Sequence, residues 1–161
     1  MKLSRSKAET ALQEAEKSNP GPWVEHSRYV AEACKNIAER CSHLSAEKAY
    51  IYGLLHDIGR YAGVTSEKHL IDGYRFCMEH FVKNAVYDDY DRLVQLCDSL
   101  ALPSGFCLLE KRFVDVALRY GTPPVMAERW RRILEIRDMF EEKINGSIYD
   151  LLPGVEENTF R

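Results

Sequence analysis

The sequence predicts an all-α fold on three observations. Apolar residues recur at helical spacing through most of the 161 residues, and no segment alternates polar and apolar residues for long enough to indicate a strand. Proline and glycine fall between the periodic segments. Because a chain of this length can bury one substantial core, we expect a single-domain helical bundle of about six to seven helices over residues 1–161.

Breakers and caps set the limits of the first three helices. A charged amphipathic helix over 4–17 stops at Asn19-Pro20-Gly21-Pro22. The second helix spans about 23–40. Ser45 can cap the third, which runs to about Asp57 before Gly59 ends it.

Four further helices account for most of the remaining chain. Pro103 stops one of them and Gly121 closes the next. Pro123-Pro124 open the last helix, in the first turn where proline is tolerated. These helices are expected from Ser66 onward and over 88–101, 106–120 and 124–144.

Composition excludes several classes of protein. The net charge of −3 leaves no basic footprint for a nucleic acid polymer. No apolar run approaches the roughly 20 residues of a membrane span, and the N-terminus is too charged for a signal peptide. The five cysteines are odd in number and lack C-x-x-C spacing, so we expect reduced, mostly buried thiols in a cytoplasmic protein.

His56 and Asp57 follow an uncharged helical run over residues 49–55. Ending a buried helix in two hydrophilic groups costs roughly a few kcal/mol each unless a partner binds them. A divalent metal ion is the simplest partner, because it satisfies an imidazole and a carboxylate together. The pair therefore predicts a metal site.

Two more residues extend this set of candidate ligands. His26 shares one helical face with Val30 and Ile37, and Asp98 continues the stripe of Val94. Two imidazoles and two carboxylates without a thiolate suit Mn, Fe, Co, Ni, Zn or Mg, and argue against a closed structural zinc site. We expect one ion per chain, with about two coordination positions left for water and substrate.

The spacing of these residues resembles a known family. His26, 29 intervening residues, His56-Asp57, 40 more residues and Asp98 are similar to the H…HD…D signature of the HD-domain superfamily of metal-dependent phosphohydrolases. His56-Asp57-Ile58-Gly59 resembles its HDIG variant. The resemblance covers about 20–101, with the helices over 106–144 packing on that core. It implies that His26, His56, Asp57 and Asp98 bind the metal, and that metal-activated water attacks a phosphate ester or anhydride, often a nucleotide.

Other residues are weaker candidates. Arg60 follows the motif and could hold a phosphate in a bidentate manner, or could be a solvated side chain after a helix end. His69 could be a ligand or a substrate contact, or an exposed histidine at a helix start. Lys111-Arg112 could reach a substrate phosphate, although the surface interpretation is preferred.

These observations favour a hydrolase acting on a small phosphorylated substrate, either a monoester or a diester. The chain has no Gly-Tyr-Pro, so it does not resemble the cyclic-dinucleotide phosphodiesterase branch. Two alternatives stay open: a di-iron oxygenase on the same scaffold, and a non-catalytic regulatory protein that binds a metal or a nucleotide. Substrate, metal identity and oligomeric state carry no readable signal.

Overall fold

The computed structural model describes residues 4–63, 72–73, 75–77 and 86–161. These residues are almost entirely helical, which confirms the all-α prediction for this part of the chain. The one sheet among them is an antiparallel hairpin of β1 (Ala101–Leu102) and β2 (Gly105–Phe106), in which Ala101 pairs with Phe106. The helices are α1 (Arg5–Ser18), α2 (Trp23–Ala38), α3 (Ala46–Leu55), η1 (Ile58–Ala62), α5 (Asp89–Asp98), α6 (Leu109–Tyr120), α7 (Met126–Ile144), η2 (Ile148–Leu151) and α8 (Val155–Thr159).

Side chains cap the starts of two of the expected helices, and the cap at Ser45 was predicted. The Ser45 hydroxyl accepts a hydrogen bond from the Lys48 backbone N–H at the start of α3. Asp88 and Asp91 form a reciprocal capping box at the start of α5. Such caps satisfy backbone N–H groups that have no partner within the helix.

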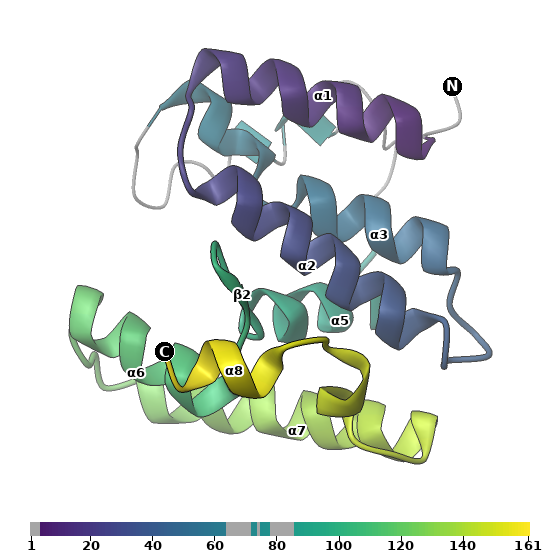
Figure 1. Ribbon diagram of the computed structural model, residues 1–161, viewed down its shortest axis with the longest axis vertical. Coiled ribbons are helices and arrows are strands. Elements are labelled where there is room, and N and C mark those ends of the chain that lie inside the picture. Colours follow the sequence, from purple (N-terminus) through teal and green to yellow (C-terminus); the bar gives the residue numbers. More distant parts are fainter. Residues whose placement is uncertain (1–3, 64–71, 74, 78–85) are drawn as a thin grey trace.

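The helices enclose two apolar clusters, and both include residues of α2. In Figure 1, α1 lies on one side of α2, and α5 and α7 lie on the other. The first cluster packs α1 against α2, α3 and η1, with Leu12, Leu54 and Ile58 fully buried. The second packs the other side of α2 against α5, α6, α7 and the C-terminal elements, around residues such as Ile37 and Phe140. Helix α2 therefore belongs to both halves of the core.

Helices α2 and α3 approach each other closely at Gly53. A Cβ atom at this position would lie 2.8 Å from Ala31 Cα and 3.0 Å from Cys34 Sγ. Real side chains do not reach such distances, so only glycine permits this approach. The contact matters for the candidate site because the His56 side chain is hydrogen-bonded to the Gly53 carbonyl.

Several predicted boundaries are wrong by a few residues. Helix α3 ends at Leu55, and His56 and Asp57 occupy a turn before η1. Phe106 belongs to β2, because Gly105 at φ +138° turns the chain back before α6 starts at Leu109.

Two C-terminal elements, η2 and α8, are absent from the prediction because each has at most five residues and so carries too little periodicity to detect. The four described cysteines other than Cys77 are buried, and all five are unpaired, as expected. Within the described residues, no helix combines the length and apolar character needed to cross a membrane.

Candidate metal centre

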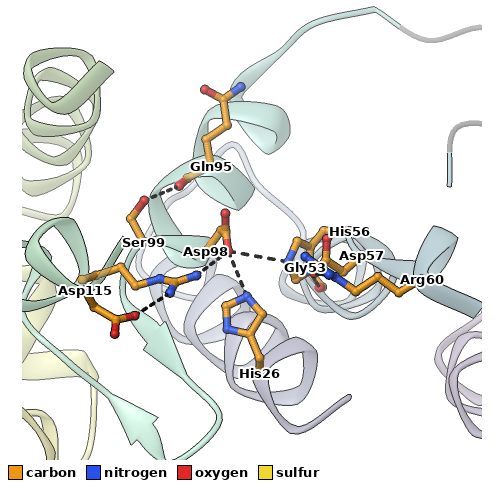
Figure 2. Close-up of polar contacts among 10 residues, drawn as sticks. His26, Gly53, His56, Asp57, Arg60, Gln95, Asp98, Ser99 and Asp115 are labelled. Atoms are coloured by element: carbon orange, nitrogen blue, oxygen red, sulfur yellow. Dashed lines mark hydrogen bonds and ion pairs between the residues drawn. The ribbon is translucent and has the colours of Figure 1, made fainter. Parts of the chain in front are cut away.

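Three helices bring the four predicted ligands together (Figure 2). His26 lies in the first turn of α2, His56 and Asp57 follow α3, and Asp98 is the last residue of α5. One oxygen, Asp98 Oδ1, lies 2.8 Å from His26 Nε2 and 3.7 Å from His56 Nε2. His56 Nε2 is in turn 3.9 Å from Asp57 Oδ2. Residues 72 positions apart in the chain therefore share one small polar cluster inside an apolar core.

The orientation of His56 is set by the backbone of its own helix. Its Nδ1 lies 2.8 Å from the Gly53 carbonyl oxygen. Because a carbonyl only accepts hydrogen bonds, Nδ1 carries the proton and the lone pair of the neutral ring is on Nε2. That nitrogen is buried and has no hydrogen-bond partner among the described residues. A bond from the second ring nitrogen to a carbonyl is the usual support of a metal-binding histidine.

Asp57 is buried and forms an ion pair with Arg60. Arg60 Nε donates to Asp57 Oδ2 at 2.5 Å. The Arg60 carbonyl accepts a hydrogen bond of 2.6 Å from the Asn19 side chain, which links η1 to the end of α1. Arg60 thus lies at the site, where it contacts Asp57.

A second arginine reaches the cluster from α6. Arg112 Nη2 lies 3.9 Å from Asp98 Oδ1, and Arg112 Nη1 donates to Asp115 Oδ2 at 3.3 Å. Only 19% of its side chain is exposed. The preferred surface interpretation of Arg112 is therefore wrong. It failed because the approach of α6 depends on the β1–β2 hairpin, which the sequence pattern did not reveal.

Lys111, the neighbour of Arg112, is not a solvated surface group either. Its Nζ donates to the Thr159 carbonyl at 2.8 Å and so joins α6 to α8.

Charge governs the protonation of the cluster. Burial lowers the pKa of His56, but the carboxylates of Asp98 and Asp57 and the Gly53 carbonyl more than offset this, so the pKa of His56 is raised above 6.5. Burial acts to raise the pKa of Asp98, yet the His26 and His56 imidazoles hold it well below 3.8. The side chain of Asp98 is 46% exposed, which favours its charged form further. The two carboxylates thus favour the protonated form of His56.

This donor set fits a divalent ion. Ligand atoms of His26, His56 and Asp57 all lie within 4.8 Å of one another, the spacing that a single ion requires. The buried Nε2 of His56 without a partner is the observation that tests the fit, since an ion would supply its missing bond. Asp98, the fourth predicted ligand, is not part of this group of three, but its Oδ1 lies 2.8 Å from His26 Nε2 at the edge of the group.

The structure brings together His26, His56, Asp57 and Asp98 and places Arg60 beside them, while their roles as metal ligands remain predictions. His69 lies outside the described residues. Among the described residues, the sequence pattern did not reveal that the Gly53 carbonyl contacts His56, nor that Arg112 lies at the cluster. Its spacing of fourteen positions after Asp98 would have indicated proximity only if the intervening turn had been recognised.

The comparison with protein families supports an HD-like domain. Residues 5–74 match the family model of the HDOD domain. HDOD is related to the HD phosphohydrolase superfamily but is distinct from it. The match includes His26, His56, Asp57 and Arg60 and ends before Asp98 and Arg112. Neither the comparison with curated proteins nor that with solved structures gave a match.

Proposed function

We propose that this protein is a metal-dependent hydrolase of phosphate esters. The observation that carries the proposal is the buried Nε2 of His56, which has no partner among the described residues and lies near Asp57 and Asp98. Two carboxylates and two imidazoles would hold one divalent ion: His26, His56, Asp57 and Asp98. When bound, such an ion would supply Lewis-acid chemistry by acidifying water and polarising a phosphoryl group.

The chain's own residues set the geometry of this reaction. The Gly53 carbonyl keeps the His56 lone pair directed at the cluster, so the ring does not have to reorient on binding. Arg60 is partly exposed beside Asp57 and can donate to a phosphoryl oxygen from that side. The surrounding helices bury His26 and Asp57, whereas the Asp98 side chain is 46% exposed, so the cluster is accessible to water at Asp98.

Activity and metal content measured together test the proposal. We expect protein purified without chelators to hydrolyse p-nitrophenyl phosphate when loaded with Mn²⁺, and His56→Ala to lose at least about 100-fold in kcat/KM together with its metal. His43→Ala is the matched control, because His43 is a partly exposed histidine that pairs with Asp89 and not with the cluster. A folded His56→Ala protein that keeps wild-type activity would refute the proposal.

A non-catalytic binding module is the second candidate. Two observations favour it: the match to the HDOD model and the Arg60 guanidinium already paired with the buried carboxylate of Asp57. Metal binding without turnover of phosphomonoesters or phosphodiesters would support this candidate over the hydrolase. The di-iron alternative needs a second ion, and the described residues contain only one group of ligands close enough to hold one.

A further inference from the structure

Arg112 is a charged group at the site that the reaction described above does not use. Its side chain is largely buried on α6, and its guanidinium reaches toward Asp98 Oδ1, the oxygen that both imidazoles also approach. Burying a guanidinium is unfavourable, because its charge loses contact with water, unless anionic or polar groups replace the solvent.

The described contacts of Arg112 do not meet this need. A guanidinium has five N–H donors, yet among the described residues Arg112 makes a single hydrogen bond, to Asp115 at 3.3 Å. Its distance of 3.9 Å from Asp98 is too long for another. Asp115 also has a better partner, since Arg119 donates to it twice, at 3.1 and 2.9 Å. Most of the donor capacity of Arg112 is therefore available to a ligand.

Hydrogen bonds to Thr159 fix the first turn of α6, the segment of backbone that carries Arg112. The Leu108 backbone N–H donates to Thr159 Oγ1 at 3.0 Å, and Lys111 Nζ donates to the Thr159 carbonyl at 2.8 Å. Both bonds tie the first turn of α6 to α8. A cation positioned in this way loses less conformational entropy on binding an anion than a free surface side chain does.

Arg112 and Arg60 flank the cluster from two sides. Figure 2 shows Asp115, the partner of Arg112, on one side of Asp98, and His56, Asp57 and Arg60 on the other. Two guanidinium groups from α6 and η1 thus border the candidate metal position. Planar donors on both sides of a cation match the several oxygens of one phosphoryl group.

The charge balance indicates which phosphate ester the site would take. The carboxylates of Asp57 and Asp98 balance a divalent ion, and Asp115 balances Arg119. Arg60 and Arg112 then leave about two positive charges, because histidines that bind a metal are neutral. This matches the dianion of a phosphomonoester better than the single charge of a phosphodiester.

We propose that Arg112 binds the phosphoryl oxygens of the substrate from the α6 side and gives the site its preference for phosphomonoesters. The inference rests on the proposed function, because the bound phosphate is a substrate only if the protein hydrolyses phosphate esters. Binding of the anion itself can be tested without turnover. Arg112 is thereby a specificity-determining residue outside the segment that matches the HDOD model.

Calorimetric titration of the Mn²⁺-loaded protein with inorganic phosphate and with dimethyl phosphate tests this site. We expect wild type to bind phosphate at least about 10-fold more tightly than dimethyl phosphate. Arg112→Gln should weaken phosphate binding about 10- to 100-fold and remove most of the preference, with Mn²⁺ content unchanged. The phosphate affinity of Arg112→Lys should lie between those of wild type and Arg112→Gln. Arg132→Gln is the control, because it removes the same charge from an exposed position on α7, and it should bind phosphate as wild type does.

Three results would overturn the inference. These are a wild-type protein that binds no phosphate, an Arg112→Gln protein that binds it as tightly as wild type, and an Arg112→Gln protein that loses Mn²⁺. The last would show that Arg112 acts by positioning Asp98.

The two proposals fail separately. Phosphate binding through Arg112 without hydrolysis of any ester would refute the hydrolase and leave the anion site intact. Hydrolysis unaffected by Arg112→Gln would refute the anion site alone.

Discussion

At the scale of single residues, ion pairs have different consequences inside the cluster and at the surface. Asp98 lies among imidazoles at the candidate site, whereas Asp89 lies at the start of α5 among Lys143, Arg92 and His43. Burial acts to raise the pKa of Asp89, but hydrogen bonds from these three side chains lower it to about 2. Asp89 therefore joins the α2–α3 turn, α5 and the end of α7 through charge.

The lowered pKa of Asp89 predicts a pH dependence of stability. A carboxyl group whose pKa is depressed on folding stabilises the protein above its unfolded pKa near 4, and this stabilisation is lost as the pH falls toward 2. We expect Asp89→Asn to lower the free energy of unfolding by about 1 kcal/mol at pH 7, after allowance for solvent screening, and by much less at pH 2. Urea unfolding at both pH values measures this. An equal loss at both would show that charge is not the cause.

At the scale of elements, the α2–α3 contact connects packing to the candidate site. Gly53 permits the close approach to Ala31, and its carbonyl orients His56. The sequence predicted both helices and the inward faces of His26 and Asp98 because these faces follow helical periodicity. It could not predict that Gly53 is the contact point, since a glycine inside a helix has no periodic signature.

Gly53→Ala tests this connection. Replacing glycine by alanine inside a helix normally stabilises the helix by up to about 1 kcal/mol. Here the new Cβ would meet backbone atoms of Ala31, so we expect a net loss of about 1–3 kcal/mol and weaker Mn²⁺ binding. Gly146→Ala is the control, because nothing lies within 4 Å of its Cβ position. A Gly53→Ala protein as stable as wild type, with unchanged Mn²⁺ affinity, would contradict the role of this contact.

At the scale of the whole molecule, α2 contributes to both apolar clusters and carries His26, which contacts His56 after α3 and Asp98 at the end of α5. The helical class and the convergence of four site residues were predictable, because both depend on local periodicity and on the spacing of the motif. Arg112 and the C-terminal elements were not. Their positions depend on a hairpin with two residues in each strand and on hydrogen bonds that Thr159 accepts from Leu108 and Lys111, which local patterns do not encode.

The central claim is that His26, His56, Asp57 and Asp98 hold one divalent ion. Calorimetric titration of metal-free protein with Mn²⁺ tests it most directly, with wild type compared to Asp98→Ala and His69→Ala. We predict that wild type binds about one Mn²⁺ per chain. The Mn²⁺ affinity should be lost or reduced about 10- to 100-fold in Asp98→Ala and unchanged in His69→Ala. No binding by wild type, or equal binding by Asp98→Ala, would contradict the claim. Two ions, one of them lost in His69→Ala, would instead favour the di-iron alternative.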